Sequence, residues 1–413
     1  MNTSQPKMML VIMRLDLLGS GKPRGPGPRF VSPESKSKLL VTLIDPSLRA
    51  TCAPITLINL ERNNLYLYNE ILGQFQGLWK QFYRVGGFID RPETYTSASQ
   101  SCVLAEMFRI GRAIRDLFYV DDHVGKWLLD LFKSATDGLT NDGLLQPVTI
   151  LTNDFDVPWF WLEHGGQFLC EVCSLGLLQL STEERPMSSP HDQRKTDYDA
   201  LLIKGSSTTS LPFLDQELNR IEKRLSEPGR FSDTFNVLRA EKSADLERLC
   251  SKFRRRSQNV RIVHFSGHYS GEKLVLGEEE VSIYHLDEIL DGSLLVLDGS
   301  SSARELEAWI DAGGFTAALI NKGALGCVVT ALPVKHDPIV SRILWDTFYR
   351  SLRGELADHG EVSKRVSVGQ ALAKARIALR DYFKAIGSPN PAWAVYQMIG
   401  NTVVQLWADS DKK

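Results

Sequence analysis

Hydrophobic residues in the second half of the chain form short unbroken runs that alternate with longer amphipathic stretches. VRIVHF (260–265) and LLVL (294–297) are typical of strands that are buried on both faces of a sheet. Between 213 and 225, apolar residues instead recur every three or four positions, which predicts a helix. The other strands predicted here are 200–203, 326–332 and 396–407, and the other helices are 241–253, 281–290, 303–312, 338–353 and 367–384. Strands that alternate with helices predict an α/β fold with a mostly parallel sheet and helices on both faces.

The first half has a different pattern, with short strands followed by long amphipathic helices. Its predicted strands are 39–44, 55–60 and 148–151, and its predicted helices are 65–83, 98–119 and 124–134. The segment 181–197, STEERPMSSPHDQRKTD, is polar and contains two prolines, so it is predicted to be a linker. We therefore expect an N-terminal α/β or helical lobe over 1–185 and a second domain over 198–408.

Composition adds limits on the class of protein. The 413 residues are enough for two domains, and 48 basic against 50 acidic residues give no excess charge that would favour nucleic acid or a membrane surface. No apolar run approaches the ~20 residues that a membrane span needs. The short apolar run near the N-terminus is interrupted by Arg14 and Asp16, which favours a first strand over a signal peptide. Six cysteines in so long a chain do not form a disulfide framework, so we expect a cytoplasmic protein.

Two of the predicted strands end in residues that can carry chemistry. HFSGHY contains His264 and His268, and the strand 294–297 is followed by DGSSS, which contains Ser300. Sites in parallel sheets lie at the carboxyl ends of strands, and a histidine beside a nucleophile is the arrangement needed for acyl transfer. By pattern alone, a histidine near a strand end is more often structural than catalytic, and Ser301 or Ser302 could cap the helix that begins at 303.

Several blocks of the second half resemble the CHAT domain, a caspase-like group of the cysteine peptidases that includes separase and the caspases. The blocks that resemble the family, in order, are VPW (157–159), LPFLDQELNRIEKRL (211–225), VRIVHFSGHY (260–269), LLVLDGSSS (294–302), GALGCVVTALPVKHD (323–337), QALAKAR (370–376) and NPAWAVYQMIGN (390–401). The resemblance covers roughly 148–406. It implies a caspase-like peptidase domain over 198–408, with His268 as the catalytic histidine and the backbone N–H groups of Tyr269 and Ser300 as the oxyanion hole. It implies no cofactor and no metal.

The sequence departs from the family pattern at the nucleophile. The family's block ends in Asn-Ala-Cys or Asp-Gly-Cys, and the cysteine aligns with Ser300. A thiolate is accessible near neutral pH, whereas a serine hydroxyl needs a tightly coupled base. Ser300 therefore indicates either an inactivating Cys→Ser change or a natural pseudo-peptidase, with a working serine hydrolase as a third reading. Tyr269 is a second departure, because the family usually has glycine there and tyrosine lacks its conformational freedom.

Asp298 stands two residues before the nucleophile position. In related peptidases that cut after Arg or Lys, an acid at this position helps to form the first substrate pocket, so the resemblance implies cleavage after a basic residue. A carboxylate can pair with a guanidinium through two hydrogen bonds. The alternative is that Asp298 caps a turn or a helix.

The remaining candidates favour structural roles. CEVC has the spacing of a metal or redox site, but no second pair of ligands lies nearby, so Cys170 and Cys173 are predicted to lie in the core. His264 lies within a strand, where we expect it to support the fold through hydrogen bonds, and His285 is expected at the surface.

The family resemblance implies a protein substrate and an activating protein partner or ligand, often in a bacterial signalling or defence system. The other hypothesis is a pseudo-peptidase that binds a peptide or protein and cuts nothing. The N-terminal lobe would be a degenerate caspase-like lobe or a regulatory domain, and the exposed side of the helices 65–83 and 98–119 would be its docking surface.

Overall fold

The computed structural model describes most of the chain in a series of segments. The described residues are 8–16, 37–44, 56–60, 63–84, 97–119, 122–137, 145–179, 198–205, 213–227, 236–256, 260–270, 273–299, 316, 318–320, 322–332, 337–354 and 366–406. The predicted linker 181–197 and the predicted helix 303–312 lie outside them.

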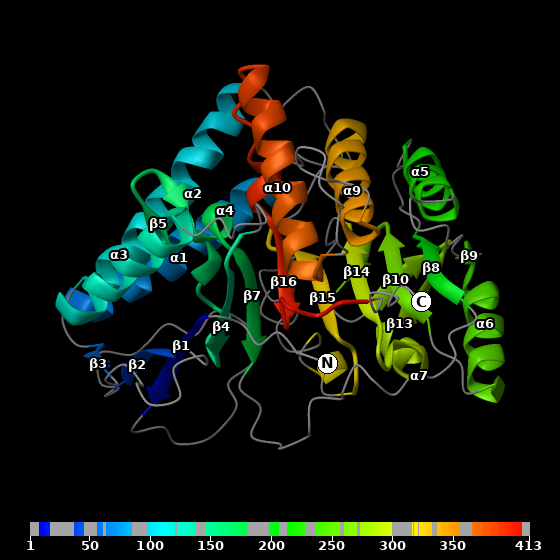
Figure 1. Cartoon of the computed structure of the whole chain (residues 1–413), viewed down its shortest axis with the longest axis horizontal. Coiled ribbons are helices and arrows are strands. Elements are labelled where there is room, and N and C mark those ends of the chain that lie inside the picture. Colours follow the sequence, from blue (N-terminus) through cyan, green and yellow to red (C-terminus); the bar gives the residue numbers. More distant parts are fainter. Residues whose placement is uncertain are drawn as a thin grey trace, which may run out of the picture.

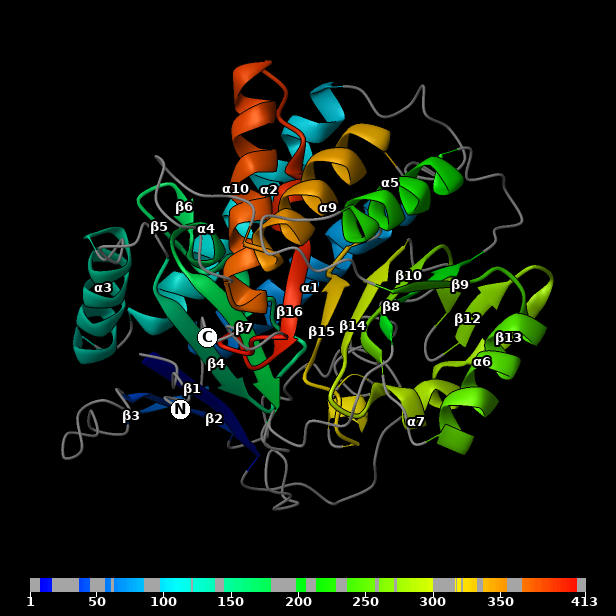
Figure 2. The same ribbon diagram turned by 45° about the vertical axis from the view of Figure 1, so that its right-hand side comes forward.

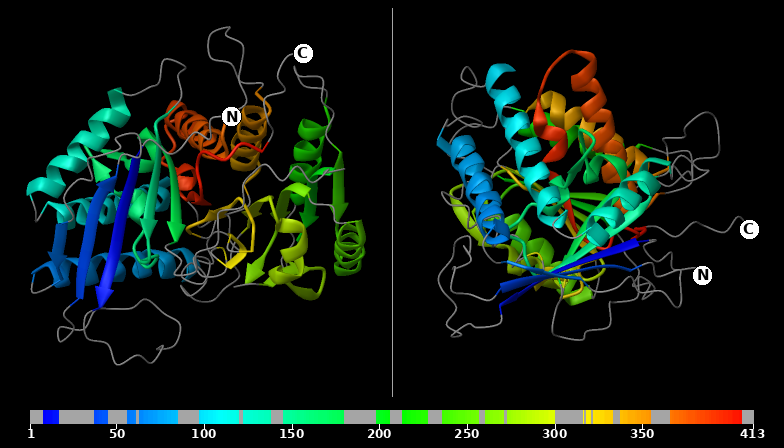
Figure 3. Two further views of the ribbon diagram at one scale, coloured as in Figure 1. Left: turned by 60° about the horizontal axis from the view of Figure 1, so that its bottom comes forward. Right: turned by 90° about the vertical axis from the view of Figure 1, so that its left-hand side faces the viewer.

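Strands from both halves of the chain form one eleven-stranded sheet in the order β3-β2-β1-β4-β7-β16-β15-β14-β10-β8-β9. Its strands are β1 (Met8–Asp16), β2 (Ser37–Ile44), β3 (Thr56–Asn59), β4 (Pro147–Thr152), β7 (Ser174–Gln179), β8 (Tyr198–Lys204), β9 (Val237–Ala240), β10 (Val260–Ser266), β14 (Leu294–Asp298), β15 (Gly326–Thr330) and β16 (Tyr396–Gly400). Figure 3 shows this order, from the blue N-terminal strands at one end to the green strands at the other.

Most neighbouring strands of the sheet are parallel. Within this sheet, the antiparallel pairs are β2 with β1, β2 with β3, and β15 with β16. Because β16 is parallel to β7 but antiparallel to β15, the two halves of the sheet run in opposite directions. The carboxyl ends of β8, β10, β14 and β15 therefore meet at one edge.

Helices cover both faces of this sheet (Figure 1). They are α1 (Asn63–Arg84), α2 (Ser97–Phe118), α3 (Asp122–Asp137), α4 (Leu169–Val172), α5 (Leu214–Ser226), α6 (Ser243–Arg256), α7 (Asp287–Leu290), α9 (Pro338–Leu352) and α10 (Val368–Ala385). The connection from β8 through α5 to β9 runs outward along the sheet, and the connection through α6 to β10 returns, so right-handed crossovers place α5 and α6 on opposite faces. Helix α9 packs between α5 and α10 (Figure 2). None of the described helices is long and apolar enough to cross a bilayer.

Smaller elements complete the fold. A three-stranded sheet is formed by β11 (Tyr269–Ser270), β12 (Lys273–Leu276) and β13 (Glu279–Ser282), directly after β10. A two-stranded hairpin is formed by β5 (Glu163–His164) and β6 (Gln167–Phe168). The predicted helix 281–290 is partly wrong, because β13 continues to residue 282 and a 3₁₀ turn (Ile283–Leu286) precedes α7.

The closing strand is shorter than the sequence predicts. It ends at Gly400, where φ is 126° and an added Cβ would lie 2.8 Å from the Gly326 Cα. The chain then turns, and the carbonyl oxygens of Thr402 and Val404 accept hydrogen bonds from amides at the start of α10. These amides have no partner within their own helix, so residues 401–404 complete the helix terminus and leave the sheet.

Candidate active site

Glycines bring the ends of β8, β10 and β14 together. The amide of Gly205 donates to the Ser266 carbonyl oxygen at 2.7 Å, and the amide of Gly267 donates to the Asp298 carbonyl oxygen at 3.0 Å. The φ of Gly267 is 153°, and an added Cβ there would lie 2.5 Å from the Gly205 Cα. Any side chain would break this backbone contact, so the three strand ends can approach only through glycine.

The same contact orients the two segments that carry the predicted catalytic residues. A Cβ on Gly299 would lie 1.9 Å from the Gly267 carbonyl oxygen, so the chain that leaves β14 presses against the chain that leaves β10. His268, which follows Gly267, is 6% exposed. Ser300, which follows Gly299, lies outside the described residues. The structure thus brings the residues next to both predicted positions together, and the pairing of His268 with Ser300 stays a prediction.

The backbone of Tyr269 points away from the small sheet. The amide of Val275 donates to the His268 carbonyl oxygen at 3.0 Å, which makes this pair a hydrogen-bonded pair of the β11–β12 ladder. Hydrogen-bonded and non-hydrogen-bonded pairs alternate in antiparallel ladders, so the next pair, Tyr269 and Leu274, is of the second type. The Tyr269 N–H is therefore directed away from β12.

The Tyr269 side chain is buried beside Thr330 at the end of β15. The Thr330 hydroxyl donates to the Gly299 carbonyl oxygen at 3.3 Å, and the Tyr269 hydroxyl is within hydrogen-bonding reach of Thr330. Burial raises the pKa of Tyr269 to about 12. The tyrosine is consequently a neutral phenol, and it helps to hold the carbonyl that precedes residue 300.

Asp298 carries a buried carboxylate at the end of β14. Its side chain is 7% exposed, and one oxygen accepts from the Trp345 indole of α9 while the other accepts from the Tyr396 hydroxyl of β16 at 3.0 Å. These donors face Asp298 across the sheet surface that α9 covers. The turn or helix cap considered from sequence accounts for neither of these two bonds.

Glu217 of α5 is a site residue that sequence reasoning missed. It is 1% exposed, and the Ser266 hydroxyl donates to its Oε1. Ser266 is the register partner of Asp298 in the parallel pair β10–β14, so their side chains point to the same face. A signal was present, because Glu217 falls within the apolar stripe of its helix, three residues after Leu214 and four before Ile221.

His264 completes this group one layer below the strand end. As the sequence predicts, it lies within β10 and is hydrogen-bonded, with Nδ1 2.7 Å from the Tyr349 hydroxyl. Burial lowers the pKa of His264 to about 4, against the opposite effect of Glu217, so the imidazole is neutral at neutral pH. One ligating atom each of Glu217, His264 and Asp298 lie within 4.8 Å of one another, close enough for one cation to contact all three.

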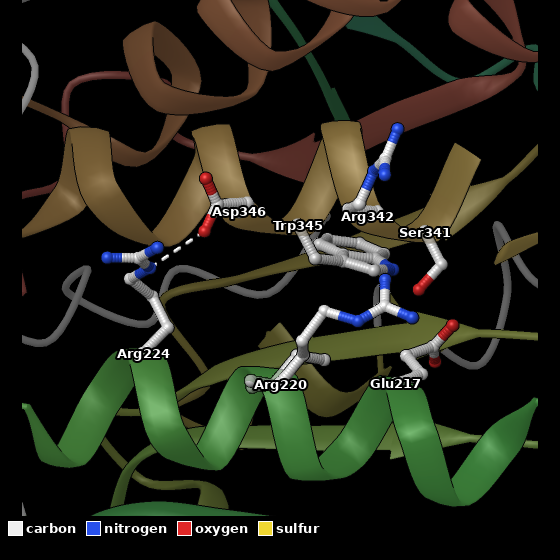
Figure 4. A pocket seen from close by; sticks show the side chains of 8 residues that line it. Glu217, Arg220, Arg224, Ser341, Arg342, Trp345 and Asp346 are labelled. Carbon is white, nitrogen blue, oxygen red and sulfur yellow. Dashed lines mark hydrogen bonds and ion pairs between the residues drawn. The ribbon is translucent and has the colours of Figure 1, made fainter. Parts of the chain in front are cut away.

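A small hollow with room for about one water molecule lies between α5 and α9, and Glu217, Trp345 and Arg342 are among the residues that line it (Figure 4). Arg224 closes one end by an ion pair of 2.7 Å with Asp346. Arg220 extends into the hollow beside Trp345. The hollow therefore reaches the side chains that hold Ser266 and Asp298.

The CEVC cysteines lie in the core, as predicted. Cys170 and Cys173 are buried at α4, and the Cys173 thiol donates to the Leu169 carbonyl oxygen at 3.0 Å. Burial raises the pKa of Cys170 to about 11 and that of Cys173 further. Both thiols are therefore protonated at neutral pH.

Comparison with known proteins identifies the family. Residues 142–401 match the CHAT domain. No curated protein matches the sequence. Among solved structures, the Arg-specific cysteine proteinase gingipain R is similar with a TM-score of 0.44 and 10% identity over 67% of each chain. A secreted C11 cysteine protease from Bacteroides thetaiotaomicron, in complex with an irreversible peptide inhibitor, is similar with a TM-score of 0.27 and 11% identity over 45% of this chain and 59% of that chain.

The family match covers well over half of the chain and includes both strand ends described above. The chain belongs to the CHAT domain family, a caspase-like family related to the cysteine peptidases.

Proposed function

We propose that this chain is a caspase-like endopeptidase that acts on a protein substrate, with Ser300 as an inactivating replacement for the nucleophilic cysteine. The observation that carries the proposal is the backbone contact between Gly267 and Gly299. This contact holds two chain segments together, and His268 and residue 300 are the residues that directly follow the contact in each segment. A base and a nucleophile that follow adjacent parallel strands suit acyl transfer.

Each part of the reaction can be assigned to a residue. A thiol at position 300 would pass its proton to the His268 imidazole and attack the peptide carbonyl carbon. The N–H groups of Tyr269 and residue 300 would hold the oxyanion, in line with the direction of the Tyr269 amide away from β12. His268 would then protonate the departing amine, and water would hydrolyse the thioester. A serine hydroxyl ionises far less readily than a thiol, so the present chain would bind substrate without cutting it.

Substrate choice is assigned to Asp298. A buried carboxylate two residues before the nucleophile favours a basic residue on the amino side of the cut bond. The Trp345 and Tyr396 donors hold the carboxylate in place, which supports a fixed pocket.

Activation by a protein partner or ligand, within a bacterial signalling or defence system, is proposed from the family resemblance. Helices α1 and α2, which match the predicted helices 65–83 and 98–119, are the proposed docking surface. Tyr66 of α1 is 71% exposed, which makes it the first position to test for binding.

A second candidate function is a natural pseudo-peptidase that binds a peptide or protein. Ser300 itself favours this function, because a serine hydroxyl needs a more tightly coupled base than the thiol for which the family's histidine is suited.

Restoring the thiol separates the two functions. We expect Ser300→Cys to cleave a fluorogenic peptide library, alone or with added candidate partner proteins, and to prefer a basic residue before the cut. The control is the double variant with His268→Ala, which should lose the activity. Cleavage only after acidic residues would contradict the role of Asp298. If no cleavage is seen with any partner, the binding module is favoured, and the serine form is then used to capture its ligand.

A further inference from the structure

We propose that Thr330 is a positioning residue of the candidate active site: its hydroxyl holds the peptide that links Gly299 to residue 300, so that the N–H of residue 300 is presented to the oxyanion. The inference rests on the proposed function, because it concerns one of the two N–H groups assigned there to the oxyanion hole. Thr330 ends strand β15 and takes no part in the bond-making steps.

The first observation is the hydrogen bond that the Thr330 hydroxyl donates to the Gly299 carbonyl oxygen at 3.3 Å. This carbonyl and the N–H of residue 300 belong to the same peptide group. In a planar trans peptide the C=O and N–H bonds point in opposite directions, so a carbonyl held toward Thr330 would direct that N–H away from it. One hydroxyl on β15 can therefore set the direction of an N–H on the neighbouring chain segment.

The order of the strands indicates where this N–H would point. In the sheet, β14 lies between β15 and β10. An N–H directed away from β15 is therefore directed toward the side of β10, where the Gly267 carbonyl presses against Gly299 and His268 follows. The proposed oxyanion hole lies on this side, since its other donor is the N–H of Tyr269, the next residue along the chain.

Tyr269 supports the same peptide through its side chain. Its ring lies against Gly299, because a Cβ added to Gly299 would lie 3.3 Å from the Tyr269 Cδ1. Its hydroxyl is within hydrogen-bonding reach of Thr330. A neutral phenol can donate to the Thr330 oxygen while the Thr330 hydroxyl donates to Gly299, and hydrogen bonds in such a chain strengthen one another. Tyr269 and Thr330 together therefore restrict rotation of the Gly299 carbonyl.

The backbone that carries Thr330 is itself fixed. Strand β15 pairs with β14 on one side and with β16 on the other. The next residue, Ala331, donates its N–H to the Val395 carbonyl oxygen at 2.8 Å and accepts from the Trp79 indole at 3.2 Å. Thr330 and Tyr269 are 7% and 3% exposed, so water competes little for their hydroxyls. The hydroxyl that holds the peptide therefore stands on a rigid support.

Kinetics in the Ser300→Cys background test the effect on the reaction. Thr330→Val keeps the shape of the side chain but removes the hydroxyl. We expect kcat to fall about tenfold or more while KM stays nearly unchanged, because an oxyanion donor acts in the transition state and its complete loss costs about 100-fold to 1,000-fold in kcat. Thr330→Ser keeps the hydroxyl and should keep most of kcat, a rescue that a role in packing alone would not produce.

Thr149→Val is the matched control. Thr149 is also a buried threonine of the sheet, 2% exposed, but its hydroxyl has no hydrogen-bond partner within the described segments. This variant should leave kcat unchanged. Should Thr330→Val fail to fold by circular dichroism, Thr330→Ala replaces it. An unchanged kcat in the folded Thr330 variant, or an equal loss in Thr330→Ser, overturns the inference.

Nuclear magnetic resonance of the chain with Ser300 as it stands tests the hydrogen bond without catalysis. When ¹³C is placed at glycine carbonyls and ¹⁵N in serines by cell-free synthesis, only peptides in which serine follows glycine give a coupled signal. The signal of the 299–300 peptide is the one that disappears in Ser300→Cys. A hydrogen bond to a carbonyl oxygen moves the ¹³C signal downfield, so Thr330→Val should move this signal upfield and Thr149→Val should not. An unmoved signal in Thr330→Val overturns the inference.

The two measurements separate the inference from the proposed function. If the signal moves in Thr330→Val but Ser300→Cys cuts nothing, the peptidase function fails and the control of the peptide by Thr330 stands. If Ser300→Cys cuts peptides but Thr330→Val changes neither the signal nor kcat, only the inference fails.

Discussion

Single side chains at the carboxyl edge of the sheet depend on one another for their protonation and position. His264 is neutral because it is buried, and Tyr349 fixes its ring through Nδ1. Asp298 is held by Trp345 and Tyr396, so truncation of either donor would remove a hydrogen bond from a buried carboxylate. Residues far apart in the sequence therefore determine the chemistry of this edge jointly.

The buried His264 should make stability depend on pH. Its pKa is about 4 in the folded chain against an ordinary value of 6.5, so the unfolded chain binds the extra proton first as pH falls. The contribution is fully present above pH 6.5 and is lost as pH falls toward 4, by about 3 kcal/mol in all. Urea unfolding over this range should show His264→Gln with a shallower dependence than the unchanged chain. His285→Gln, at an exposed position, should keep the full dependence; equal slopes for all three proteins would contradict the role of His264.

The strand ends at this edge meet through their backbones. The ends of β8 and β10 touch at Gly205 and Gly267, and the chain beyond β14 touches the same point through Gly299. The positive φ of Gly267 adds a second requirement for glycine. The position of His268, the proposed catalytic histidine, therefore depends on a contact between strands.

Replacement of Gly267 by alanine should disrupt this junction. The new methyl group would lie 2.5 Å from the Gly205 Cα, so the strands must separate, and we expect the free energy of unfolding to fall by about 1–3 kcal/mol. Equilibrium urea unfolding measures the change. Gly73→Ala is the control, because nothing lies within 4 Å of the added methyl in α1 and alanine favours a helix. A Gly267→Ala protein as stable as the Gly73→Ala protein would refute the packing argument.

Strand β16 joins the two halves of the chain that lie on either side of the predicted linker. This strand pairs with β15 on one side and with β7 on the other, so the two halves share one sheet. Two tryptophans of the N-terminal half reinforce the joint: the Trp79 indole donates to the Ala331 carbonyl oxygen at 3.2 Å, and the Trp161 indole to that of Ala394 at 3.0 Å. Ala331 directly follows Thr330, so the N-terminal half contacts the segment beside the candidate active site.

A shared sheet should make unfolding cooperative. Because β16 cannot keep its partners if either half unfolds, we expect a single urea transition, with the same midpoint by far-ultraviolet circular dichroism and by tryptophan fluorescence. Two separated midpoints would instead show that 1–185 and 198–408 are independent domains. The predicted division of the chain is tested by the same measurement.

The sequence by itself determined several buried strands and the family. Apolar runs gave β10 and β14 within a residue of their observed bounds, because strands buried on both faces need such runs whatever surrounds them. Ordered blocks such as VRIVHFSGHY identified the CHAT domain, and the serine at position 300 can be read directly.

Only the tertiary structure decided which distant residues meet. Glu217 joins Ser266, and Trp345 and Tyr396 join Asp298, because helices α5 and α9 and strand β16 come to the same edge of the sheet. The last strand stops at Gly400 for a similar reason, since residues 401–404 supply carbonyl oxygens to the start of α10. Local patterns record propensity and burial, whereas these contacts depend on strand order and crossover direction, which no short segment encodes.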